Sequence, residues 1–371
     1  MALSTINNSS MADTAVHGVR NLIINGAMQV AQRGTSSTSA GIQTVDRFKT
    51  NFSGPSIIQT QETLSSGEPY DRGFRKFYRM QVTTASSSTA AYVECASSFE
   101  GQDIAQSGWQ YTSSNSSITV SFWARSSLAG TYYIVYQTRD GTEYHRNYAF
   151  TLAANTWTKV TFTTTGNSNL QIDSDTGRGL DLYIIPAYGT DYTGGEEVSL
   201  TDWYTRNGQT DAYLPNFTEN WANTLNATFD ITGVQLEVGS TATPFEHRSY
   251  GDELARCQRY YEKTYPYANT PGTASSYNTI TALGMAGMDE ETSGQRYMTY
   301  PWRVEKRASP TLTIYDQAGN SGKVTTLDNA GTQTHNVGVA LAFAGTYVMG
   351  AGPSNSAIWG LTFFCVGDSE L

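Results

Sequence analysis

The chain has 371 residues, of which 39% are hydrophobic and only 15% carry a charged side chain, and its net charge is -10. This length and apolar content suit a globular protein of two domains, and the abundance of Ser, Thr, Asn, Gly and Tyr favours short strands and many turns over helical bundles. The negative net charge argues against a nucleic-acid partner, because the affinity of such partners usually comes from a basic surface.

The N-terminal residues 1–20 are polar and nearly aperiodic, so we expect an arm that stays disordered or becomes ordered on a partner. They contain no basic region followed by an apolar one, and nowhere do about eighteen apolar residues run together. We therefore expect folding in a cytoplasm and no membrane insertion. Cys95, Cys257 and Cys365 show no metal or redox spacing and are expected to be free buried thiols, and no cofactor is predicted.

Residues 21–243 show strand patterns and no sustained helical period. The clearest alternation places Ile118, Val120, Phe122 and Ala124 on one face, which we expect to be core. Further strands are predicted at 131–137, 148–152, 157–164 and 182–185, separated by turn signals at the spacing typical of a β-sandwich.

The strand that closes this region changes its parity. Phe229 and Ile231 occupy odd positions, whereas Val234 and Leu236 occupy even ones. A strand can place both pairs on one face only with an extra residue, so we predict a β-bulge at Gly233.

Residues 244–268 are predicted to form a Ser/Thr/Pro elbow followed by a short helix, with Ser249 as its N-cap and Asp252 three residues later. Apolar residues recur along this helix in one narrow stripe, formed by Tyr250, Leu254, Cys257 and Tyr261. So short a helix must bury its stripe, either against its own chain or against copies of itself around an axis.

Residues 269–371 return to strand patterns and predict a second, smaller β domain, a sandwich or barrel. The fold class expected for the chain is therefore all-β: a jelly-roll β-sandwich over 21–243, the elbow and short helix over 244–268, and the second β domain over 269–371.

Several sequence blocks carry a resemblance to a known family. They are NLIINGAMQVAQRG followed by VDRF, SITVSFWARSS, NTWTKVTFTTTG and the long closing block FDITGVQLEVGSTATPFEHRSYGDELARCQRYY. Their order resembles a module of phage virion proteins, mainly tail fibres and related appendages, and the module is similar to jelly-roll carbohydrate-binding modules. The resemblance covers roughly residues 21–262.

The resemblance implies a homotrimeric virion appendage of a tailed phage that adheres to host-surface glycan. The arm would dock on other virion proteins, the jelly roll would form the body and the C-terminal domain the exposed tip; the location would be the virion, after synthesis in the host cytoplasm. Two alternatives stay open: a capsid decoration or head-fibre protein with a stabilising or loosely adhesive role, and a glycan depolymerase.

Jelly-roll sugar-binding modules often hold a structural calcium through acids near the NG turn and in the closing strand. This sequence departs from that pattern, because Gln29, Thr232 and Gly233 stand there. Calcium needs six to eight oxygen ligands, several of them normally anionic. No metal is therefore predicted, and Asp46 and Asp230 are the nearest candidates.

Candidate sugar-binding residues are aromatic side chains with polar neighbours, because glycan sites combine flat aromatic surfaces with hydrogen-bonding groups. Trp123 is the sharpest, since it shares the face opposite Ile118 with Arg125; Trp109 and Tyr111 lie in a predicted rim loop. Weaker candidates are Tyr133, Tyr144, Trp203 and Tyr204. Burial in the sandwich is the competing explanation for each.

Enzymatic motifs are not found: the sequence contains no GxSxG elbow, phosphate-binding glycine loop or HExxH helix. Acids are paired at Glu196–Glu197 and at Asp289–Glu291. Adjacent acids in a loop cannot flank a glycosidic bond by themselves, so we expect no enzyme.

Overall fold

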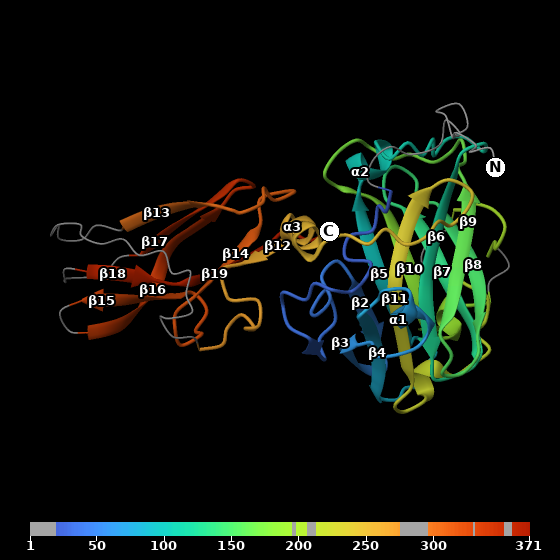
Figure 1. Ribbon diagram of the computed structural model, residues 1–371, viewed down its shortest axis with the longest axis horizontal. Coiled ribbons are helices and arrows are strands. Elements are labelled where there is room, and N and C mark those ends of the chain that lie inside the picture. Colours follow the sequence, from blue (N-terminus) through green and yellow to red (C-terminus); the bar gives the residue numbers. More distant parts are fainter. Residues whose placement is uncertain (1–19, 195–197, 206–212, 275–295, 329–330, 352–357) are drawn as a thin grey trace, which may run out of the picture. The chain divides into compact units, whose positions relative to one another are not determined.

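The computed structural model describes residues 20–194, 198–205, 213–274, 296–328, 331–351 and 358–371 (Figure 1). The chain divides into two compact units. The first contains residues 1–29, 35–248 and 371, and the second contains residues 30–34 and 249–370. Nearly all of the predicted N-terminal arm lies outside the described residues. Both units are built from antiparallel sheets, which confirms the all-β fold class.

The first unit is a sandwich of two sheets. The six-stranded sheet has the order β1-β3-β4-β11-β6-β9 and the five-stranded sheet the order β2-β5-β10-β7-β8. The strands of the first are β1 Ser36–Ser37, β3 Ser56–Thr63, β4 Lys76–Thr84, β11 Thr228–Val238, β6 Ser117–Ser126 and β9 Thr158–Thr165. Those of the second are β2 Lys49–Ser53, β5 Tyr92–Glu100, β10 Arg178–Tyr188, β7 Gly130–Thr138 and β8 His145–Leu152. Most successive strands lie in different sheets, as in a jelly roll, whereas β3 pairs with β4 and β7 with β8 in the same sheet.

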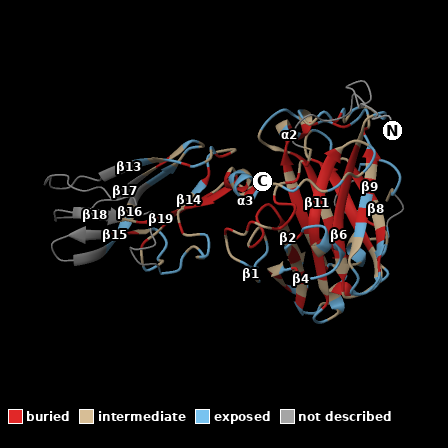
Figure 2. Ribbon diagram, in the orientation of Figure 1, coloured by how far each residue is buried: buried red, intermediate tan, exposed pale blue. Residues whose placement is uncertain are grey.

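The core of this unit lies between the two sheets (Figure 2). Ile118, Val120, Phe122 and Ala124 of β6 are fully buried in it, as their alternation predicts. Short helical turns connect some of the strands: α1 Glu68–Asp71, α2 Gly101–Ala105, and the 3-10 turns η2 Thr190–Tyr192 and η3 Trp221–Asn223.

The closing strand β11 contains the predicted bulge. Its register with β6 shifts between Thr232 and Gln235, and Gly233 has a φ of 65°. A Cβ at Gly233 would lie 2.6 Å from the ring of Phe74, so the position requires glycine for both backbone and space. The bulge returns Val234 to the core beside Ile231.

The second unit contains a three-stranded and a five-stranded sheet, in the orders β12-β19-β14 and β13-β17-β16-β15-β18. Their bounds are β12 Tyr261–Lys263, β19 Phe364–Asp368, β14 Thr311–Tyr315, β13 Arg296–Pro301, β17 Thr346–Ala351, β16 Gly331–Ala342, β15 Lys323–Asp328 and β18 Ile358–Thr362. A small core includes Trp302, Tyr347 and Phe363. Among the described residues, no helix has the length and apolar character needed to cross a membrane.

Helix α3, Tyr250–Gln258, begins as predicted: the backbone N–H of Asp252 donates to Ser249 Oγ over 3.2 Å. The predicted four-residue stripe is wrong, because the helix ends before Tyr261, which lies in β12 opposite Asp368. Tyr250 is 47% exposed, whereas Cys257 is fully buried within its own chain, and Leu254 is half-buried. Two residues of the stripe, Cys257 and Tyr261, are thus buried within one copy of the chain, and packing of the helix against a second copy stays a prediction.

Residues 30–34 belong to the second unit although they lie far from it in sequence. The side-chain amide of Gln32 donates to the carbonyl of Tyr261 over 2.8 Å. The guanidinium of Arg33 lies 3.6 Å from the ring centroid of Tyr261 and pairs with Asp368 at 3.0 Å and Glu370 at 3.4 Å. This segment is thus an integral part of the smaller unit.

Candidate ligand-binding cleft

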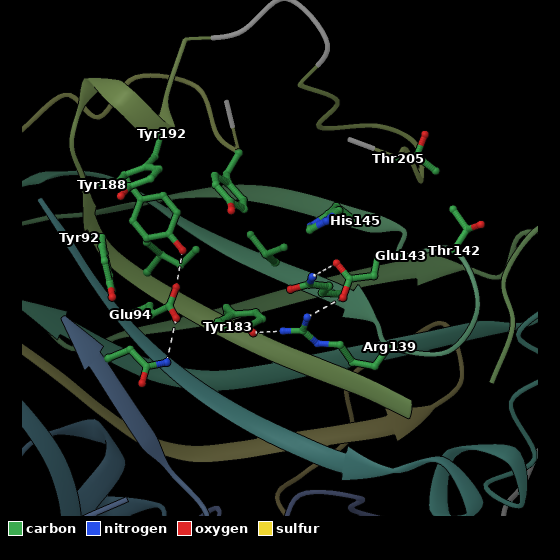
Figure 3. Close-up of a pocket in the computed structure, with 15 residues that line it drawn as sticks. Tyr92, Glu94, Arg139, Thr142, Glu143, His145, Tyr183, Tyr188, Tyr192 and Thr205 are labelled. Atoms are coloured by element: carbon green, nitrogen blue, oxygen red, sulfur yellow. Dashed lines mark hydrogen bonds and ion pairs between the residues drawn. The ribbon is translucent and has the colours of Figure 1, made fainter. Parts of the chain in front are cut away.

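The outer face of the five-stranded sheet in the first unit carries a cleft of about 620 Å³ (Figure 3). Its floor includes Val135 of β7 and Tyr183 and Ile185 of β10. Val135 and Tyr183 are directly opposite each other in the ladder. Because side chains alternate along a strand, these residues point away from the core that their neighbours Ile134 and Ile184 fill.

Four tyrosines form an aromatic cluster on one side of the cleft: Tyr92, Tyr188, Tyr192 and Tyr213. The centroid of Tyr192 lies 5.9 Å from that of Tyr92, 5.7 Å from that of Tyr188 and 6.0 Å from that of Tyr213. A second bulge, between Ile184 and Ala187 of β10, turns Tyr188 outward opposite Tyr92. The cluster therefore combines two strand residues with two residues from the neighbouring loops.

Glu94 lies beside this cluster, on β5. The Tyr188 hydroxyl donates to its carboxylate, and the side-chain amide of Asn51 donates to Glu94 Oε1 over 3.0 Å. Burial raises the pKa of Glu94, while these two hydrogen bonds act in the opposite direction. A carboxylate has about four acceptor positions, so Glu94 retains capacity to accept from a ligand hydroxyl.

Arg139 lies at the other side of the cleft, near Glu143 and Thr142 (Figure 3). Its Nη1 donates to Glu143 Oε1 over 2.8 Å, its Nε donates to Asp181 and its Nη2 to the Tyr183 hydroxyl. Asp181 is fully buried and also pairs with Arg178. These contacts hold the guanidinium in one orientation.

His145 is buried at the wall of the cleft and pairs with Tyr204 of the described loop segment 198–205. Its backbone exchanges two hydrogen bonds with Tyr204, of 2.8 Å and 3.0 Å. Its ring lies 5.8 Å from that of Tyr204 and 6.3 Å from that of Tyr213. Tyr204 therefore supports the wall and does not itself line the cleft.

None of the sugar-binding candidates chosen from the sequence lines this cleft. Trp109 and Trp203 are buried in the sandwich core, and Tyr111 and Tyr144 pack against it. Tyr133 is buried in the small apolar cluster that includes the floor residues Val135 and Ile185, but it does not itself line the cleft. Trp123 is only 6% exposed and lines a different cavity, of about 670 Å³, on the outer face of the six-stranded sheet with Phe74 and Trp157.

Arg125 and the metal candidates have structural partners. Asp230 is fully buried and accepts hydrogen bonds from Arg125 and Arg79, and Asp46 is fully buried. Within the part of the chain that the structure describes, no group of three or more His, Cys, Asp or Glu could hold a metal ion. The paired acids Glu196–Glu197 and Asp289–Glu291 lie outside the described residues.

Residue type alone does not distinguish the cleft tyrosines, because the chain has 24 tyrosines and most half-buried strand surfaces can carry one. A usable signal existed in β5, where Val93 and Cys95 are core residues and Tyr92 and Glu94 alternate with them on the opposite face. In β10 the bulge hides the same signal, because it shifts Tyr188 by one position relative to Tyr183.

Comparison with solved structures finds distant structural likenesses. No family model matches the chain, and no curated protein matches it. The CBM22-1 xylan-binding domain from Paenibacillus barcinonensis Xyn10C is 13% identical, with 56% of this chain and 94% of that chain covered and a TM-score of 0.27. A family 11 carbohydrate-binding module from Clostridium thermocellum, in complex with a mixed-linked tetrasaccharide, is 10% identical over 57% of this chain and 98% of that chain, with a TM-score of 0.27. A cyclase from Fischerella sp. TAU is 9% identical over 61% of this chain and 100% of that chain, with a TM-score of 0.34. We base the functional proposal on the cleft itself.

Proposed function

We propose that the first unit binds a glycan chain in the cleft on its five-stranded sheet. The observation that supports this proposal is the aromatic cluster of four tyrosines beside the hydrogen-bonding groups of Glu94, Asn51 and Arg139. Sugar rings present apolar C–H faces that pack on aromatic rings, and hydroxyls that exchange hydrogen bonds with carboxylates, amides and guanidinium groups.

The arrangement favours binding over cleavage. Glu94 and Glu143 are the carboxyl groups among the described residues that line the cleft, and each is engaged in hydrogen bonds, Glu94 with Tyr188 and Asn51 and Glu143 with Arg139 and Gln137. Groups held in this way are suited to orienting a ligand. We therefore propose a non-catalytic adhesion module, and incubation with a bound polysaccharide should generate no new reducing ends.

The biological setting that we propose is a virion appendage of a tailed phage, adhering to glycan on the host surface. Its support is the order of the sequence blocks from NLIINGAMQVAQRG to the closing FDITGVQLEVG stretch. In this proposal the N-terminal arm attaches the protein to other virion proteins and the chain forms a homotrimer. Light scattering that finds a monomer at micromolar concentration, with the arm intact, would count against the trimer.

Binding can be tested by titrating the full chain with host-surface polysaccharide in a calorimeter. Replacement of a central aromatic contact typically costs about 2 kcal/mol, which is roughly thirtyfold in affinity, so Tyr192→Ala should lose most of the binding. Tyr250→Ala is the matched control, because Tyr250 is an exposed tyrosine of the second unit. Equal affinity of Tyr192→Ala and wild type would overturn the assignment of the cleft.

A further inference from the structure

The ionisable side chains of the cleft suggest which glycans it accepts. Apart from tyrosines, the described lining residues include Glu94, Glu143, Arg139 and His145. Two of these are carboxyl groups and one is a guanidinium. Selectivity for or against acidic sugars depends on whether the positive charge of Arg139 remains available to a ligand.

The charge of Arg139 is compensated within the protein. The guanidinium forms ion pairs with Asp181 and with Glu143, and Asp181 in turn pairs with Arg178. The charges of these two guanidinium groups and two carboxylates sum to zero. Arg139 can still donate a hydrogen bond from its remaining N–H groups, but it offers no net positive charge to an acidic sugar.

Among the residues that the structure describes, none forms such an ion pair with Glu94 at the cleft. Its hydrogen-bond partners there, Tyr188 and Asn51, are neutral. Lys49 and Arg139 act on Glu94 electrostatically at longer range and offset its charge in part, although Lys49 is not a lining residue. The aromatic end of the cleft therefore presents an ionisable carboxyl group to the ligand.

We propose that the cleft accepts uncharged glycan chains and rejects chains that carry carboxylate groups, with Glu94 as the residue that determines this selectivity. The inference rests on the proposed glycan-binding function. A ligand carboxylate beside the Tyr188 ring would face Glu94 at short range, where like charges repel strongly because the protein and its aromatic side chains exclude water. A neutral hydroxyl at the same place donates to Glu94.

The test compares neutral chains with acidic chains of the same backbone. Full-length protein is titrated with cellohexaose and its C6-carboxyl form, with mannan and mannuronan oligomers, and with galactan and galacturonan oligomers. Wild type is expected to bind the neutral member of at least one pair at least tenfold more tightly than its acidic member. The discrimination should shrink at high salt, which screens charge repulsion.

Glu94→Gln identifies the residue responsible, because it removes the charge at nearly constant shape. The variant should narrow the ratio between neutral and acidic affinities, whereas Glu68→Gln, at an exposed carboxylate beside the other cavity, should leave it unchanged. The proposed selectivity would be overturned, without affecting the glycan-binding function, if acidic chains bound wild type as tightly as neutral ones. It would also be overturned if Glu94→Gln left the ratio of neutral to acidic affinity unaltered. If no member of any pair binds, the glycan-binding function itself is overturned, and the inference with it.

Discussion

Replacing Asp230 by Asn should destabilise the first unit strongly, because this carboxylate joins three strands of the six-stranded sheet. Asp230 of β11 is fully buried and accepts from Arg79 of β4 at 2.7 Å and 2.9 Å, and from Arg125 of β6 at 2.9 Å and 2.7 Å. Asn would keep the shape but leave two guanidiniums facing each other without the negative charge that both require.

The expected loss can be worked from these contacts. Removing one partner of a buried ion pair costs about 3–5 kcal/mol. The two arginine side chains are 27% exposed, so water screens part of the repulsion and we take the lower end, about 3 kcal/mol. For a unit of this size, about 2–4 °C is lost per kcal/mol, and the melting temperature should fall by roughly 6–12 °C.

Differential scanning calorimetry of wild type and Asp230→Asn measures this shift directly. Asp71→Asn is the control, because Asp71 is an exposed carboxylate of the same unit and its loss should cost under about 0.5 kcal/mol. A melting temperature of Asp230→Asn within about 1 °C of wild type would refute the argument. Calcium that stabilised wild type but not Asp230→Asn would show that Asp230 is a metal ligand instead.

Three further changes test other parts of the structure. Burial raises the pKa of Glu94 in the folded protein above its value in the unfolded chain. Ionisation of Glu94 therefore destabilises the fold at a pH above the folded-state pKa and has no effect at a pH below the unfolded-state pKa. Glu94→Gln should melt at a higher temperature than wild type at about pH 8, and the difference in melting temperature should shrink towards about pH 4. A difference that does not depend on pH would contradict this. Gly233→Ala should cost about 2–4 kcal/mol in a denaturant titration, from its positive φ of 65° and the contact with Phe74. Gly108→Ala, at a φ of 89° with no heavy atom within 4 Å of the added Cβ, lacks the contact and should cost less. Arg33→Ala should lower the stability of the second unit by about 1–2 kcal/mol, measured by hydrogen exchange, whereas Arg33→Lys should recover only the ion pairs with Asp368 and Glu370.

Patterns that depend on one strand or one helix end were predictable from the sequence. Alternation in β6 identified its core face, the parity change in β11 identified the bulge, and Ser249 was placed correctly as a helix cap. Each of these follows from local geometry, which neighbouring residues determine.

The cleft could not be predicted in the same way, because it depends on which strands become neighbours. Tyr92 and Tyr188 are far apart in the chain and meet only through the pairing of β5 with β10. Residue type was misleading as well: the large rings of Trp109 and Trp203 fill the core, where their apolar area is best buried. The end of helix α3 was also missed, because the ladder between Tyr261 and Asp368 overrides the helical spacing of Tyr261.

The assignment of residues 30–34 to the second unit has a practical consequence for dividing this chain. A fragment that starts at Ser249 would lack Gln32 and Arg33, and with them the stacking on Tyr261 and the ion pairs at the C-terminal strand. Exchange of residues 249–370 between related chains would likewise separate Tyr261 from Arg33, which stacks on its ring. Recombination between related chains is therefore expected to be tolerated only where residues 30–34 and residues 249–370 come from the same parent.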